Sequence, residues 1–144
     1  MNYFNSNSNS NTVFKDIILL LVRVFIGFAM LSHGFPKLQM LLEGGKIEFF
    51  DFLGLGPKIS LGLTVFAEFA CSILLILGLF TRIALGFLMF TMIIAGFVIH
   101  GADPFSKKEM SLLYLSIYLL LMLFGAGKIS VDYMIEKRKR ASEW

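Results

Sequence analysis

The chain has 144 residues, of which 57% are hydrophobic and 16% charged, and its formal net charge at pH 7 is +3. This composition, with a mean hydropathy of +0.79, excludes an ordinary soluble domain and predicts one integral membrane domain. The small charge excess and the lack of any nucleic-acid motif exclude a nucleic-acid partner. The single cysteine excludes an intramolecular disulfide and CxxC redox chemistry.

The first part of the chain combines a polar tract with an apolar helix. Residues 1–15 are rich in asparagine and serine and are predicted to be unstructured, because they cannot bury enough apolar surface to fold. A membrane-spanning helix is predicted over 16–35. It does not resemble a signal peptide, because its start is not basic and Arg23 interrupts the apolar run. Gly34 followed by Pro36 predicts the end of this helix.

The remainder of the chain predicts three more spans and a basic tail. Several phenylalanines beside acidic residues indicate a short interfacial helix within 38–58. The later spans share long apolar runs and are predicted over 59–80, 83–100 and 110–126. Short connections make neighbouring helices antiparallel. The predicted fold is therefore an all-α, four-transmembrane-helix antiparallel bundle over 16–128, followed by a tail over 129–144.

The distribution of basic residues predicts the orientation of the bundle. The side that holds both termini and the 81–82 turn carries seven basic residues: Lys15, Arg82, Lys128, Lys137, Arg138, Lys139 and Arg140. The opposite side carries five: Lys37, Lys46, Lys58, Lys107 and Lys108. Because basic residues are retained on the cytoplasmic side, both termini are predicted to be cytoplasmic.

Two charged residues are predicted to lie inside the membrane at similar depth. With a rise of about 1.5 Å per residue, Arg23 lies roughly 12 Å from the cytoplasmic end of its helix and Glu68 roughly 16 Å from the same side. An unpaired charge at that depth is costly, so an Arg23–Glu68 ion pair is predicted. The pair has two interpretations, a lock between two helices or the polar part of a ligand site.

Two histidines are predicted at the outer edge of the membrane. His33 and His100 each lie roughly 27 Å from the cytoplasmic end of their helices, close to the level of Lys37. They have three interpretations: ordinary interfacial residues, a polar lining for the headgroup of a quinone or another proton-coupled ligand, or haem or metal ligands. The last is the weakest, because two histidines without further ligands do not make a metal site. The candidate ligand-binding residues are Arg23, His33, Lys37, Glu68 and His100.

Three segments together resemble the DoxX family of small bacterial membrane proteins. They are RVFIGFAMLSHGFPKL from Arg23, AEFACSILLILGLFTRIA around Glu68, and FGAGKISVD ending at Asp132. The resemblance implies a four-helix inner-membrane fold. Namesake members of the family resemble a subunit of a thiosulfate:quinone oxidoreductase, and other members are associated with membrane redox complexes. The lack of paired cysteines separates the chain from four-helix quinone-linked disulfide enzymes.

Three functions follow as hypotheses. The first is a redox-linked membrane subunit, part of an oxidoreductase, that binds a quinone-like ligand within the bundle. The second is a non-catalytic membrane anchor or assembly partner of a larger complex. The third, a small transporter, is disfavoured because the sequence contains no inverted repeat. The expected partners are the lipid bilayer and either other redox-complex subunits or further copies of the chain.

Overall fold

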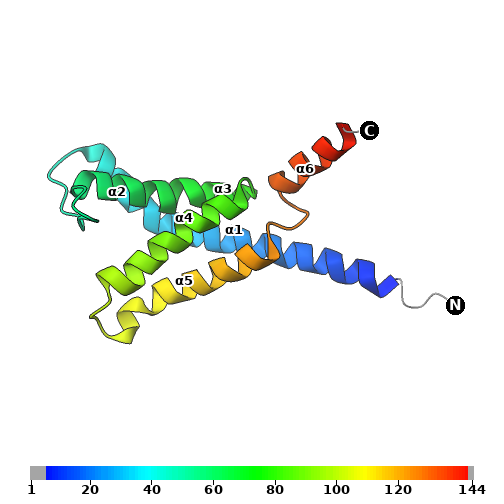
Figure 1. The fold of residues 1–144 in the computed structure, drawn as a ribbon, viewed down its shortest axis with the longest axis horizontal. Helices are drawn as coiled ribbons and strands as arrows, with labels where there is room; N and C mark the ends of the chain where they lie inside the picture. The colour runs from blue at the N-terminus through cyan, green and yellow to red at the C-terminus, as the bar shows by residue number, and fades with distance from the viewer. Residues whose placement is uncertain (1–5, 143–144) are drawn as a thin grey trace.

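The computed structural model of the protein describes residues 6–142, with side chains from residue 11 onward. Over these residues the chain is helical and contains no strand (Figure 1). Its segments are α1 (Ser6–Glu43), α2 (Pro57–Val65), η1 (Phe66–Ala70), α3 (Cys71–Leu77), α4 (Thr81–Ile93), η2 (Ile94–Ile99), α5 (Phe105–Phe124) and α6 (Val131–Ser142). The π-helical segments η1 and η2 each continue an α-helix without a break. The all-α prediction is therefore confirmed for the described residues.

Each of the four predicted spans overlaps one continuous helix, and three of them extend one to three residues beyond its end. Two continuous helices, Pro57–Leu77 and Thr81–Ile99, are long and apolar enough to cross a membrane. They correspond to the predicted spans over 59–80 and 83–100. The predicted span over 16–35 lies inside α1, and the span over 110–126 lies in α5 except for its last two residues; both helices carry more polar residues at their ends.

Helix α1 extends beyond the predicted span at both ends. It begins at Ser6, within the tract predicted to be unstructured, whereas residues 1–5 of that tract lie outside the described residues. Extending an existing helix forms one hydrogen bond for each residue that is ordered, so polar residues can be added to an apolar helix. The predicted end at Gly34 and Pro36 was wrong, because α1 continues through Pro36 to Glu43. Contacts of Gly34 and Lys37 with η1 hold the helix on both sides of the proline.

The predicted interfacial helix was also wrong. Residues 44–56 form no helix. Four of them have left-handed backbone angles that interrupt a right-handed helix: Gly44 (φ 65°), Leu53 (φ 57°), Gly54 (φ 73°) and Gly56 (φ 90°). The loop is instead held by side chains. The Asp51 carboxylate accepts a hydrogen bond from the Gly56 amide at 2.8 Å, and the Ser60 hydroxyl accepts one from the Phe52 amide at 2.9 Å.

The helices form two packed groups that diverge. Helix α1 packs along α2, η1 and α3, whereas α4 and η2 pack along α5. The two groups meet at the α3–α4 turn and separate toward the end of the molecule that carries the 44–56 loop (Figure 1). The core where they meet contains Leu75, Leu85, Leu88 and Tyr118, whose side chains are fully buried. The divergence leaves space between η1 and η2 for a cavity.

Gly34 permits the close crossing of α1 and η1. A Cβ atom at this position would lie 2.9 Å from the Glu68 carbonyl carbon and 3.0 Å from the Phe69 nitrogen. Because backbone atoms cannot move aside, Gly34→Ala should lower the free energy of unfolding by about 2 kcal/mol. Thermal unfolding in mild detergent measures the change. Gly62→Ala is the matched control, because nothing lies within 4 Å of its added Cβ, and it should be neutral or slightly stabilising.

Candidate functional site

Glu68 forms an ion pair with Lys37. The Lys37 Nζ atom lies 2.6 Å from both carboxylate oxygens of Glu68. The Glu68 side chain is 5% exposed and that of Lys37 30% exposed, so the pair reaches from the interior to the edge of the bundle. The predicted Arg23–Glu68 pair was therefore wrong. Both carboxylate oxygens are occupied by a lysine from α1 that lies nearly four helical turns beyond Arg23.

Two local features of the helices place this pair. Glu68 lies in the middle of the π-helical segment η1, and Gly34 allows α1 to approach the backbone of Glu68 closely. Lys37 lies one turn beyond Gly34, so its side chain reaches the carboxylate. Short π-helical segments inside α-helices occur frequently at functional sites. Here the second such segment, η2, lies on the opposite wall of the same cavity.

A cavity of about 390 Å³ lies beside the ion pair. Its volume falls within the range of small-molecule sites, which begins near 300 Å³. Most of its lining is aromatic or aliphatic, and it includes six phenylalanines: Phe49, Phe50, Phe52, Phe66, Phe87 and Phe90. Its charged or titratable lining consists of Lys37, Glu68 and His100. An apolar chamber with a few converging polar groups is the usual form of a site for a largely apolar ligand.

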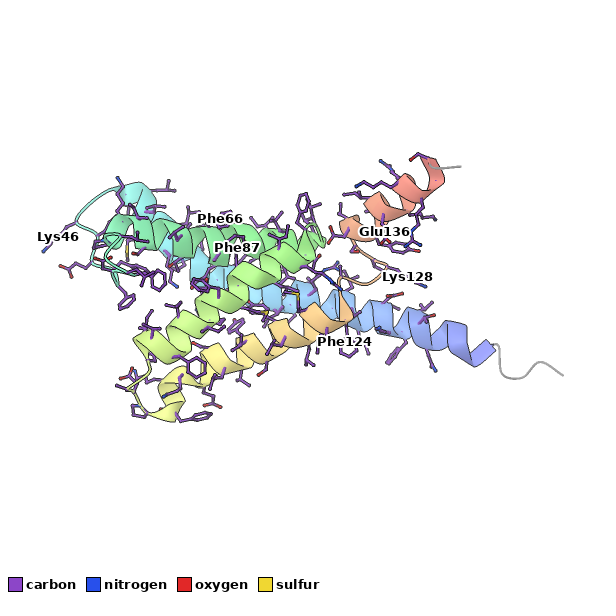
Figure 2. The ribbon with its side chains drawn as sticks, viewed as in Figure 1. Lys46, Phe66, Phe87, Phe124, Lys128 and Glu136 are labelled. Carbon is purple, nitrogen blue, oxygen red and sulfur yellow. The ribbon has the colours of Figure 1, made fainter. Side chains whose placement is uncertain are left out.

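Aromatic pairs connect the two walls of the cavity. Phe66 of η1 meets Phe87 of α4 edge to face, with 5.3 Å between the ring centroids (Figure 2). One turn farther along α4, Phe90 meets Phe52 of the 44–56 loop at 6.0 Å. Phe66, Phe87 and Phe90 are each about half exposed on the outer surface of the bundle. The cavity is therefore bordered, on this apolar face, by aromatic side chains from both helix groups.

The two histidines lie in different surroundings. His100 ends η2 and lines the cavity, and its Nδ1 atom lies 2.8 Å from an Asp103 carboxylate oxygen. His33 is exposed and is not among the residues that line the cavity; its ring meets that of Tyr114 edge to face at 5.9 Å. The structure thus brings Lys37, Glu68 and His100 to one cavity and leaves His33 on the side facing α5. Over the described residues, no three His, Cys, Asp or Glu side chains converge to hold a metal ion.

Arg23 belongs to a second polar centre, at the opposite end of the bundle. Its side chain is 1% exposed and donates hydrogen bonds to the carbonyl oxygens of Ala126 and, at 2.8 Å, Ile129. Both carbonyls belong to the loop between α5 and α6. Arg23 therefore binds the loop between α5 and α6 to the first helix. It does not line the cavity.

Asp132 completes this centre from the first turn of α6. Its carboxylate accepts hydrogen bonds from the amides of Phe80 at 2.8 Å and Thr81 at 2.9 Å, which begin α4. It also attracts Arg23 electrostatically. Gly78 lets the Arg23 guanidinium lie close to the α3–α4 turn. Its φ is 68°, and an added Cβ would lie only 2.8 Å from the guanidinium. The three sequence segments around Arg23, Gly78 and Asp132 therefore meet at one point.

The comparison with known proteins decides the family. The family model DoxX matches residues 18–101, more than half of the chain. The chain belongs to the DoxX family. It is 29% identical over 140 residues to an uncharacterized protein of Haemophilus influenzae, covering 90% of this chain and 99% of that one. It is 28% identical over 130 residues to the inner membrane protein YphA of Escherichia coli, covering 82% of this chain and 90% of YphA. No solved structure matches the chain significantly.

Sequence reasoning missed two features of this DoxX-family protein. Asp132 lies within a segment that supports the family resemblance, but nothing in a single sequence indicates that its carboxylate caps a helix more than fifty residues earlier. The aromatic lining was missed as well. The cluster around Phe50 was interpreted as part of an interfacial helix, although the same phenylalanines indicate equally well a loop that folds over an apolar cavity.

Proposed function

We propose that this DoxX-family protein is a bacterial inner-membrane protein that binds a quinone-like ligand in the cavity beside Lys37 and Glu68. In this proposal it is a redox-linked subunit, with four spans formed by the helices from α1 to α5. The observation that carries the proposal is the cavity itself, in which a mostly apolar, aromatic lining surrounds a single ion pair. The resemblance to YphA, named an inner membrane protein, supports the location.

The lining supplies what a quinone headgroup requires. Phenylalanine rings offer flat apolar surfaces against which an aromatic or quinoid ring can pack. The Lys37 ammonium has three N–H donors. Two of them can serve the two Glu68 oxygens, and the third can donate a hydrogen bond to a ligand carbonyl oxygen. His100 adds an imidazole that can donate or accept a hydrogen bond and is oriented by Asp103. Electrons for a redox reaction would come from a partner subunit.

The open side of the cavity supports a lipid-soluble ligand. Leu63, Phe66, Phe87 and Phe90 line the cavity and are about half exposed on the outer face of the bundle. If α2 and α4 span the bilayer, these side chains face hydrocarbon rather than water. A ligand would then reach Lys37 and Glu68 from within the membrane, which suits a quinone with an apolar tail.

The two histidines provide a test with a matched control. His100→Ala removes a polar group of the cavity and should lower the quinone retained per protein about fivefold, the effect of losing one hydrogen bond of about 1 kcal/mol. His33→Ala should retain the wild-type amount, because His33 lies outside the cavity. Quinone is extracted from protein purified in mild detergent and quantified by chromatography. Absence of quinone from the wild-type protein, after incubation with ubiquinone and menaquinone, would refute the proposal.

The proposed orientation can be tested separately. Because basic residues are more numerous at the end that carries both termini, a reporter fused after residue 144 should be cytoplasmic. A reporter inserted in the 101–108 loop should be periplasmic. Alkaline phosphatase, which is active only outside the cytoplasm, and a green fluorescent protein, which fluoresces only inside it, give opposite readouts at each site. A periplasmic C-terminus would reverse the orientation and place the cavity near the cytoplasmic side.

The second candidate function is a membrane anchor or assembly partner. It is favoured by an apolar hollow of about 530 Å³ between α1 and α5, lined by side chains such as Phe25, Leu120 and Phe124. A helix of another subunit could pack there. Cysteine cross-linking from Leu120→Cys in native membranes tests this alternative, because a partner seated in the hollow forms a discrete cross-linked product and lipid does not.

A further inference from the structure

Helix α6 extends away from the bundle and carries two kinds of side chain. It leaves the end of the molecule at which α3 meets α4, and it packs on the bundle only through its first turn (Figure 1). Its first half contains Tyr133, Met134 and Ile135, and its second half contains the four consecutive basic residues 137–140. Apolar and basic residues are therefore separated along the helix axis.

The apolar half of α6 is exposed. Met134 is 55% exposed, Ile135 41%, and Ile129, just before the helix, 47%. Large apolar side chains that are exposed together on a short segment mark an interaction surface when nothing in the fold covers them. This segment continues directly from a bundle whose outer surface is apolar as well.

The basic half keeps a net positive charge, because its four basic residues outnumber Glu136 and Glu143, which flank them in the sequence. Glu136 is paired with Arg140, one turn along the helix. The Asp132 carboxylate is turned inward, toward the amides of Phe80 and Thr81, so it does not offset the charges at the end of α6. The outward surface of the helix is therefore cationic, and Lys128 lies close by in the preceding loop (Figure 2).

The position of α6 along the bundle matches a membrane surface. The loop before it is tied to the first helix, because the Lys128 amide donates a hydrogen bond to the Asp16 carboxylate at 3.0 Å. At the same end, the Lys15 ammonium lies 5.1 Å from the centre of the Phe124 ring. Long basic side chains with apolar stems are typical of the boundary between hydrocarbon and headgroups. Helix α6 begins at this level.

We propose that α6 is a docking site for anionic phospholipid headgroups. Its apolar half lies in the boundary layer of the bilayer, and residues 137–140 contact phosphates of the same leaflet. Along α6 the apolar residues come first, next to the bundle, and the basic residues follow. A bilayer surface presents hydrocarbon and phosphates in the same order, whereas an acidic protein or a nucleic acid offers no apolar layer beside its charges. The proposal does not depend on quinone binding or on which leaflet is involved.

The test uses the full-length protein in nanodiscs of defined composition. An environment-sensitive fluorophore is attached at Met134→Cys in a Cys71→Ala background, which leaves a single thiol. In nanodiscs containing phosphatidylglycerol the emission should shift to the blue and quenching by neutral acrylamide should fall, relative to nanodiscs of phosphatidylcholine alone. At 1 M salt the Debye length is only about 3 Å, so the difference should largely disappear.

Charge variants identify the residues responsible. Each basic residue near an anionic surface strengthens binding about fivefold, so replacing all of 137–140 by glutamine should abolish the dependence on phosphatidylglycerol. The matched control, Lys107→Gln with Lys108→Gln, removes two charges from the opposite end of the bundle. It should keep the dependence on phosphatidylglycerol. Equal exposure of the label in both lipids would overturn the proposal. The proposal would also be overturned if, in native membranes, a protein that can be cross-linked to α6 shields the label and added phosphatidylglycerol does not.

Discussion

Replacing Arg23 by methionine should lower the free energy of unfolding by about 4 kcal/mol. The methionine fills similar space but donates no hydrogen bond. The carbonyl oxygens of Ala126 and Ile129 would then be left without donors in the interior. Asp132 would also lose the positive charge it attracts. Unfolding by denaturant in detergent micelles, followed by circular dichroism, measures the change.

Two further variants show whether the hydrogen bonds are responsible. Arg82→Met removes an exposed arginine from the same end of the bundle and should change stability by less than about 0.5 kcal/mol. Arg23→Lys keeps the charge but should recover only part of the loss, because one ammonium group does not reproduce the planar fork of a guanidinium. Full recovery by lysine would show that charge alone, and not the pair of carbonyl contacts, stabilises this end of the fold.

The second large effect is expected at the ion pair of the cavity, and it is asymmetric. Lys37→Leu leaves the Glu68 carboxylate buried without a partner and should cost about 3 kcal/mol. Glu68→Leu leaves a lysine that is 30% exposed and can turn its ammonium toward water, so it should cost about 1 kcal/mol. The double variant should cost less than the sum, because it leaves no charge behind.

A comparison of two double-mutant cycles distinguishes the observed pairing from the one expected from depth alone. The Lys37 and Glu68 substitutions should show a coupling energy of about 1–2 kcal/mol. The Arg23 and Glu68 substitutions should be additive, because these residues have different partners. Coupling between Arg23 and Glu68 with none between Lys37 and Glu68 would contradict the geometry described here.

The errors of sequence reasoning in this chain have specific physical causes. Helix rise predicts the depth of Arg23 and Glu68, but it does not give the rotation of each helix or the reach of each side chain. Those quantities decided that Lys37, not Arg23, meets the carboxylate. Likewise, Pro36 disfavours a continuing helix locally, yet packing of Gly34 against η1 outweighs that preference.

The sequence by itself determined where the four long apolar helical segments lie, the family and the residues that cannot face lipid alone. Long apolar runs form helices because helices satisfy the backbone hydrogen bonds locally, and charged residues within such runs require partners. Only the tertiary structure decided which partners these are. Loops carry the carbonyls that meet Arg23 and three of the phenylalanines that border the cavity, and the carboxylate that caps α4 lies in the first turn of α6. The path of a loop depends on contacts between residues distant in the chain, which no local pattern contains.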